Sequence, residues 1–274
     1  MSEWIQWPRA KYWDRPWNPI VGCKAASPAC ANCYARTAMV GRFGQSFEPH
    51  PTKQQTPPRK GVVFCGNMTD LFGEWRTCGE MAQDVMYAWK GDPCQPHTAT
   101  YLWLTKRTGR MMAALEYAGK HTFWPEKDLS AMYSNHYFGF TAEDQTHYAE
   151  RLLPVYEQRE DWMQCWVSCE PLLGPIDLRL KSEAIRKNIK WVVVGCESGP
   201  NRRPCGMGWV ESIAAQCMNA KIPLFIKQLD LNGRCETDIN KFPEHLRIRQ
   251  VPWAGRTAAA RQDKDGETKG AESC

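Results

Sequence analysis

The sequence lacks any apolar run of the roughly 18 residues that a membrane helix needs, and its first residues lack the apolar run of a signal peptide. These absences argue against a membrane partner and favour a cytoplasmic location. The chain has 274 residues, of which 43% are hydrophobic, which is enough for one core of barrel size. We expect a single domain over residues 1–253 and a polar, disordered tail over residues 254–274.

Disulfides are not expected either, although cysteine is abundant. The chain has 13 cysteines, an odd number, without the export signal that accompanies disulfide scaffolds. Cys65, Cys165 and Cys196 lie in apolar runs and are interpreted as small core residues. The composition therefore favours reduced thiols, a few of which act as metal ligands.

Short β-rich runs alternate with helical stretches along the chain. Runs such as VVF, YLWL and WVVV are apolar nearly throughout, which is typical of parallel strands buried on both faces. No G-x-G-x-x-G follows the first run, which disfavours an open dinucleotide-binding sheet. We expect an α/β fold, a TIM-like (β/α) barrel, complete or partial, with six to seven parallel strands. The predicted strands cover residues 19–23, 62–66, 100–105, 137–141, 164–169, 190–196 and 222–227, and the predicted helices 31–43, 81–89, 108–117, 145–158 and 209–219.

Positive charge is concentrated near the N-terminus. Residues 1–60 hold nine Lys or Arg and three acids, a net charge of +6, while the whole chain carries +5. Trp4, Trp7, Trp13 and Trp17 lie among these charges, a combination that suits contact with a polyanion. An N-terminal segment that packs its tryptophans on the core explains the same pattern.

Polar residues follow each predicted strand. The carboxyl ends of the strands of a parallel barrel meet on one face, where barrel enzymes place their active sites. The pattern predicts a polar active site on this rim, and ordinary solvated loops are the alternative. The residues concerned are Cys23, Asn67, Thr69, Asp70, Lys106, Arg107, Glu143, Asp144, Ser168, Glu170, Glu197, Ser198, Lys227 and Gln228.

Three cysteines stand close together after the first predicted strand. Cys23, Cys30 and Cys33 form a C-x6-C-x2-C motif, which can hold three irons of a [4Fe–4S] cluster and leave the fourth iron open. A structural zinc site normally has four ligands, and no second C-x2-C or H-x3–5-H occurs. His50 as a remote fourth zinc ligand, or three cysteines without metal, are the alternatives.

These residues resemble the radical S-adenosylmethionine (SAM) superfamily, and more closely a phage-associated family with an atypical three-cysteine loop. The resemblance extends from Trp17 to Gln228. It implies a partial barrel, a [4Fe–4S] cluster on Cys23, Cys30 and Cys33, SAM bound to the open iron, and an electron donor such as flavodoxin or ferredoxin. The segments that carry it are WNPIVGCKAASPACANCYA, FCGNMTDLF, LWLTKRTGRM, VSCEPLLGPIDL, VVVGCESGPNRRP and PLFIKQ.

One departure concerns the spacing. Most superfamily members have C-x3-C-x2-C with an aromatic residue before the third cysteine, whereas here the first spacer is six and Asn32 takes the aromatic position. Tyr34, directly after Cys33, is the candidate to cover the adenine edge of SAM instead.

The resemblance also implies roles for residues on the rim. Asn67 and Asp70 stand where such enzymes contact the SAM amino group. Glu143, Ser168 and Glu170 are candidates for ribose or substrate contacts, because a carboxylate accepts hydrogen bonds from both ribose hydroxyls. Glu143, Glu170 and Lys106 are the candidate catalytic residues. Salt bridges on the rim, with Lys106, Arg107 or Arg203, are the structural alternative for each acid.

The class of enzyme implied by the resemblance cleaves SAM to a 5′-deoxyadenosyl radical, which takes hydrogen from the substrate. Phage relatives are associated with hypermodified thymines, so the expected substrate is an amino-acid-bearing thymine in phage DNA that is rearranged, in the infected host cell. Such a base must be flipped out or single-stranded. Two alternatives remain: a radical SAM enzyme acting on a free metabolite or peptide, and a non-catalytic Fe–S or zinc module that binds nucleic acid.

Overall fold

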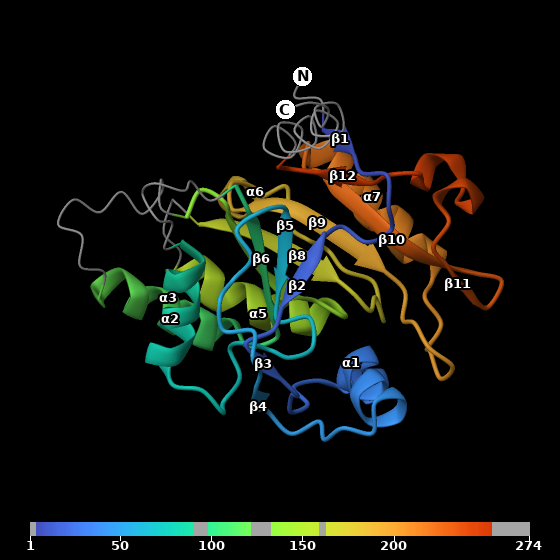
Figure 1. The fold of residues 1–274 in the computed structure, drawn as a ribbon. Helices are drawn as coiled ribbons and strands as arrows, with labels where there is room; N and C mark the ends of the chain where they lie inside the picture. Colours follow the sequence, from blue (N-terminus) through green and yellow to red (C-terminus); the bar gives the residue numbers. More distant parts are fainter. Residues whose placement is uncertain (1–3, 90–97, 122–132, 159–162, 254–274) are drawn as a thin grey trace, which may run out of the picture.

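A computed structural model describes residues 4–89, 98–121, 133–158 and 163–253. Its centre is one eight-stranded sheet, in the order β11-β10-β9-β8-β7-β6-β5-β2 (Figure 1). The seven strands from β2 to β10 are parallel to their neighbours, and β11 joins antiparallel at one edge. The strands are β2 (Arg15–Trp17), β5 (Val62–Cys65), β6 (Thr100–Thr105), β7 (His136–Thr141), β8 (Gln164–Cys169), β9 (Ile189–Gly195), β10 (Leu224–Leu231) and β11 (Arg234–Glu236).

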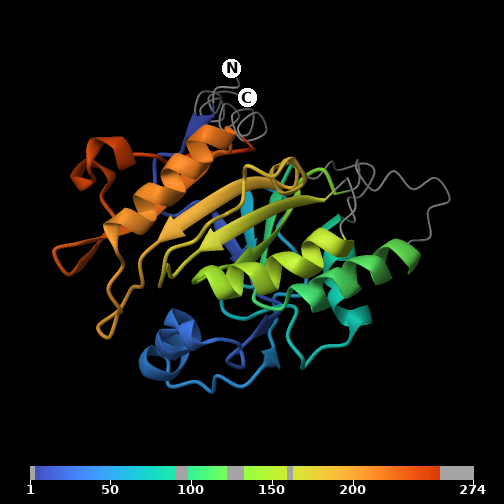
Figure 2. The same ribbon diagram turned by 180° about the vertical axis from the view of Figure 1, so that it is seen from behind.

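Helices connect the parallel strands and cover one face of the sheet, as Figure 2 shows for α3, α5 and α7. Alternate strand residues point to opposite faces. Val63 and Trp103 therefore face the helices, where they belong to the same buried cluster as Met81 and Leu152. The helices of this layer are α2 (Cys78–Trp89), α3 (Thr108–His121), α5 (Gln145–Gln158), α6 (Glu183–Arg186) and α7 (Met207–Ala220).

The other face of the sheet carries a second core made mainly of aromatic rings. Strand residues such as Phe64, Trp166 and Trp191 pack there against Trp7 and Tyr12 from the N-terminal segment. Trp166 fits because residue 139, beside it on β7, is glycine: a Cβ there would lie 2.3 Å from the indole. The N-terminal segment is held in place by strand β1 (Ile5–Gln6), which pairs antiparallel with β12 (Gln250–Val251).

The first strand of the sheet differs from the prediction. Residues 19–23 were expected to form it, but Ile20–Val21 (β3) pairs antiparallel with His50–Pro51 (β4) in a separate two-stranded sheet. The first parallel strand is β2, which pairs with β5. It contains Pro16, which cannot donate to a ladder and is tolerated because β2 is an edge strand.

The helix predicted over residues 31–43 is also more irregular than expected. It is divided into a 3₁₀ turn η1 (Pro28–Asn32), the short α1 (Tyr34–Arg36) and a π-helical segment η2 (Thr37–Arg42). The strands predicted over residues 100–105 and 164–169 and the helix over 145–158 are confirmed at the same residues. The remaining predicted elements are present with shifted ends.

The sheet confirms the predicted α/β class and the run of parallel strands. Within the described residues the edge strands β2 and β11 are not paired with each other. None of the helices in these parts of the chain is long and apolar enough to cross a membrane. The disordered tail predicted over residues 254–274 lies outside the described residues.

Candidate functional site: a cavity lined by three cysteines

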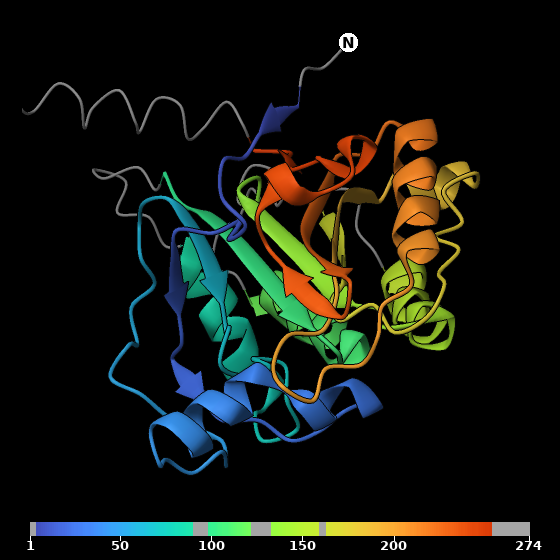
Figure 3. The same ribbon diagram turned by 90° about the vertical axis from the view of Figure 1, so that its right-hand side faces the viewer.

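A cavity of about 480 Å³ lies where the carboxyl ends of the parallel strands meet the cysteine loop, which we define as residues 22–33. In Figure 3 the strand arrows point toward the segment that carries this loop and α1. Cys23, Cys30 and Cys33 all line the cavity, and so do residues at the ends of β5, β6, β7, β8 and β9 and residues within β10. The predicted convergence of the cysteine motif with the polar strand ends is therefore present.

The three thiols are free and partly buried, and their surroundings differ. Burial, with Asp70 nearby, raises the pKa of Cys23 to about 11. Burial acts in the same direction on Cys30, but the amide of Ala26, whose nitrogen is 3.4 Å from Sγ, and the Lys106 ammonium outweigh it and lower its pKa. In the described parts of the chain no three His, Cys, Asp or Glu side chains are already arranged as a metal site.

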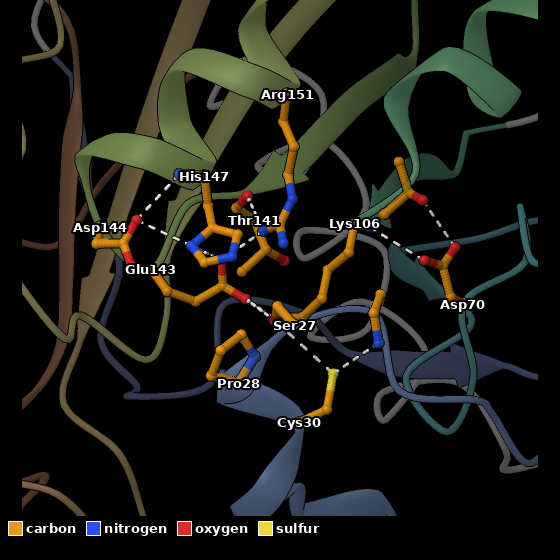
Figure 4. Close-up of polar contacts among 12 residues, drawn as sticks. Ser27, Pro28, Cys30, Asp70, Lys106, Thr141, Glu143, Asp144, His147 and Arg151 are labelled. Carbon is orange, nitrogen blue, oxygen red and sulfur yellow. Dashed lines mark hydrogen bonds and ion pairs between the residues drawn. The ribbon is translucent and has the colours of Figure 1, made fainter.

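Glu143, which follows β7, is hydrogen-bonded to the cysteine loop (Figure 4). Its carboxylate is 1% exposed and accepts a 2.6 Å hydrogen bond from Ser27 Oγ of the loop. Lys106 and Arg151 donate to the same carboxylate. Both oxygens are thus engaged by residues of the protein, and Glu143 is absent from the cavity lining. Its position is that of an anchor between the end of β7 and the loop.

Glu197, just after β9, holds the far end of the loop. Its Oε2 accepts hydrogen bonds from Asn32 Nδ2 at 2.9 Å and from Arg203 Nε at 3.0 Å. Arg203 Nη1 also donates to the carbonyl oxygen of Pro28 at 3.2 Å. Asn32, which occupies the position where the superfamily has an aromatic residue, therefore fixes the loop to the sheet.

Asp70, after β5, completes the support. Its carboxylate is buried and accepts from Thr105 Oγ1 at 2.8 Å, from the Lys106 amide at 3.1 Å and from Arg107 Nη1 at 3.0 Å. Arg107 Nη2 in turn donates to the carbonyl oxygen of Lys24 in the loop at 3.1 Å. Asp70 thus binds the end of β6 and orients Arg107, which reaches the loop.

The beginning of the loop requires glycine and is bonded to the segment after β5. Gly22 has φ +85°, and a Cβ there would lie 2.3 Å from the carbonyl oxygen of Glu48. Thr69 Oγ1 donates to the carbonyl oxygen of Gly22 at 2.5 Å. Tyr34 donates its hydroxyl to the carbonyl oxygen of Asn67, whose side-chain oxygen accepts from Asn18 Nδ2 at 2.8 Å.

The wall of the cavity formed by β8 and β10 carries a separate polar group. Glu170 Oε1 is 2.8 Å from Lys227 Nζ, while its Oε2 accepts from Ser168 Oγ and from Tyr12 OH, both at 3.2 Å. Burial, with Glu170 close by, raises the pKa of Tyr12 and keeps its hydroxyl protonated.

On the side of the cysteine loop, burial lowers the pKa of Lys106, which lies near the thiols, to about 8.

Of the residues of the predicted rim and site, Glu143 and Asp144 do not line the cavity. The others do, including Tyr34, Asn67, Lys106, Ser168 and Glu170. The lining also includes residues that the sequence did not place at the site, among them Tyr12, Trp13 and Cys196. Cys196 was interpreted as a core residue, and it is buried, with its side chain also at the cavity. Tyr12 gave no local signal, and Trp13 was noted only as one of four tryptophans among basic residues, because both reach the site from the N-terminal segment.

The fold and the site define a mostly parallel α/β protein with a cysteine-lined cavity at the carboxyl ends of its strands. Residues 8–241 match the family described as "Protein of unknown function (DUF5131)". The chain belongs to this family. No curated protein and no solved structure matches the chain.

Proposed function

We propose that this chain is a radical SAM enzyme in which Cys23, Cys30 and Cys33 hold a [4Fe–4S] cluster. The observation that carries the proposal is that all three thiols, on a loop anchored to three strand ends, line one cavity with the polar residues of the rim. We further propose that the sheet is an incomplete TIM-like barrel, because its seven parallel strands follow one another in chain order.

The residues present fit such a cluster in their chemistry. Cysteine thiolates are the ligands of Fe–S clusters, and the three thiols are not bonded to other cysteines. Since the thiols are not already arranged as a metal site, their side chains must rotate toward one another when the cluster is bound. When bound and reduced, a [4Fe–4S] cluster supplies the electron that cleaves SAM to methionine and a 5′-deoxyadenosyl radical.

The chain's own residues divide the remaining tasks. Glu143 and Glu197 fix the loop at Ser27 and Asn32. Lys106 places a positive charge beside Cys30, which favours the thiolate form that a metal requires. The Ser168 hydroxyl and Glu170 carboxylate face the cavity and can accept hydrogen bonds from SAM or substrate hydroxyls.

For the substrate we propose an amino-acid-bearing thymine in DNA, which the enzyme rearranges. The support for this substrate is the positive charge in the cavity lining. The lining includes Lys11, Lys24 and Lys227, beside Lys106 and Arg107, which hold the loop. A base within a duplex cannot reach such a cavity, so the substrate must be flipped out or single-stranded. A cytoplasmic flavodoxin or ferredoxin is the proposed electron donor.

The test is anaerobic reconstitution with iron and sulfide, then reduction in the presence of SAM and assay for 5′-deoxyadenosine. The proposal predicts its formation by the parent and none by Cys30→Ala. Formation of a cluster without SAM binding or cleavage would favour a non-catalytic Fe–S module. Tetrahedral zinc on the same thiols, with no cluster, would contradict the enzyme proposal.

A further inference from the structure

The four tryptophans of the N-terminal segment do not share one role. Trp7 and Trp17 are buried in the two cores, and their indole nitrogens donate to the carbonyl oxygens of Lys11 and Gln54. Trp7 and Trp17 are core residues, as expected if the N-terminal segment packs its tryptophans on the core. Trp13 differs, because it is partly buried and lines the cavity beside Phe64, with ring centres 5.9 Å apart. Trp13 is therefore placed to contact a ligand.

The cations of the cavity are also of two kinds. Lys106 is paired with Glu143, Arg107 with Asp70 and Glu74, and Lys227 with Glu170. The acids that line the cavity are Asp70, Glu170 and Glu197, and Glu197 is paired with Arg203.

Lys11 and Lys24, which also line the cavity, have no acidic partner in the described part of the chain. The cavity is therefore left with unpaired positive charge, which a ligand anion can neutralise.

Lys11 and Trp13 form a unit at this wall. The Lys11 ammonium lies 3.6 Å from the centre of the Trp13 ring, a cation–π contact. A ligand phosphate would draw the ammonium into an ion pair and uncover the ring face that it now occupies. A planar base can then stack on the indole, which accepts any base because every base has a π-face.

We propose that Trp13 and Lys11 form the nucleotide-recognition site of the cavity, with the base on the indole and the phosphate on the ammonium. The size of the cavity, about 480 Å³, lies within the range of small-molecule sites. The inference rests on the proposed function in that both assign the substrate to this cavity. Nucleotide binding itself requires neither iron nor SAM.

The test is calorimetric titration of the iron-free protein at low salt with thymidine 5′-monophosphate and, separately, with thymidine. We expect Trp13→Ala to weaken both ligands about tenfold or more, because stacking is lost. Lys11→Met is expected to weaken the monophosphate about threefold to tenfold and not to weaken thymidine, which has no phosphate to pair with the ammonium. Trp4→Ala and Lys53→Met are matched controls, because neither residue lines the cavity, and both should bind as the parent does.

Thermal melts of every variant separate loss of fold from loss of binding. Parent-like binding by both Trp13→Ala and Lys11→Met would overturn the proposal, and so would absence of monophosphate binding to the parent. A third titration, with SAM, distinguishes the two possible bases: SAM binding that depends on Trp13 without monophosphate binding assigns the ring to adenine of SAM and also overturns it. Iron and 5′-deoxyadenosine assays on the same variants report separately on the proposed function.

Discussion

The two walls of the cavity use their polar residues differently. On the cysteine-loop side, Asp70, Glu143 and Glu197 are almost completely buried, and each accepts several hydrogen bonds from the protein. On the opposite side, Glu170 and Lys227 are paired with each other and line the cavity. Asp70 and Glu197 line the cavity too, but they hold the loop or the arginine that reaches it, whereas Glu170 is bonded to Lys227, Ser168 and Tyr12. Acids that looked alike in the sequence thus differ in whether they anchor the loop.

This difference teaches that polar strand ends are not by themselves evidence of catalysis. A loop that holds three thiols near one another must be fixed against the entropy of its backbone, which costs about 1–2 kcal/mol for each ordered residue. Charged hydrogen bonds from three strand ends supply that order. The expected division is that the anchors govern stability and the ligand-facing residues govern chemistry.

The largest expected effect on stability is at Glu143. Glu143→Ala leaves the buried Arg151 and the partly buried Lys106 without their carboxylate, so we expect the free energy of unfolding to fall by about 3–5 kcal/mol. Urea denaturation measures it. Lys120→Ala, in an exposed pair with Glu116, is the control and should change stability by less than about 1 kcal/mol. An equally small effect at Glu143 would show that it is no anchor.

Asp70 and Asn67 separate the two roles within one segment. Asp70→Ala removes a buried acceptor of several hydrogen bonds and should lower the free energy of unfolding by about 2–3 kcal/mol. Asn67→Ala loses one side-chain bond and should cost about 1 kcal/mol while weakening SAM binding to reconstituted protein. Parent-like SAM binding by Asn67→Ala would give this segment a purely structural role.

Glu197 predicts a dependence of stability on pH. Burial acts to raise its pKa, but hydrogen bonds from Arg203 and Asn32 outweigh burial and hold the pKa below its usual value of 4.5. The stabilisation is therefore present above pH 4.5 and lost as pH falls through the lower pKa of the folded state.

Glu197→Gln should lower the free energy of unfolding by about 1–2 kcal/mol at pH 7, and the difference should shrink below pH 4.5. Urea denaturation of both proteins at several pH values measures this. Alkylation of Cys30 and Cys33 should be faster in the variant, because Asn32 and Pro28 are released. If the difference in the free energy of unfolding between the two proteins stays constant across pH, the lowered pKa of Glu197 is contradicted.

The smallest expected effect on stability is at Ser168. Its hydroxyl donates to Glu170 at the cavity, and Ser168→Ala should change the free energy of unfolding by no more than about 1 kcal/mol. If Ser168 contacts SAM or substrate, the variant should nevertheless form less 5′-deoxyadenosine under single-turnover conditions. Unchanged formation, with unchanged stability, would remove Ser168 from the site.

The sequence predicted well what depends on local pattern. The strands over residues 100–105 and 164–169 were recognised because apolar runs bounded by polar residues are typical of buried parallel strands. The position of β2 was missed because Pro16 disfavours a strand unless it lies at an edge, and edges are set by the tertiary fold.

The site shows the same division. The cysteine motif and the strand ends were identifiable because the parallel order of the strands brings their ends together. The roles of Glu143 and Trp13 were not identifiable, because each depends on partners from other segments. The partners of Glu143 include Ser27 and Arg151. Trp13 packs beside Phe64 at the cavity. Sequence spacing does not contain such contacts.

The most direct test of the account is the iron content of anaerobically reconstituted protein. We expect about four irons per parent chain and loss of the cluster in each of Cys23→Ala, Cys30→Ala and Cys33→Ala. Cys65→Ala is the matched control, because Cys65 is buried among the helix-facing core residues, and it should retain the iron. A parent chain that binds no iron, or a full cluster in Cys30→Ala, would contradict the assignment of this loop.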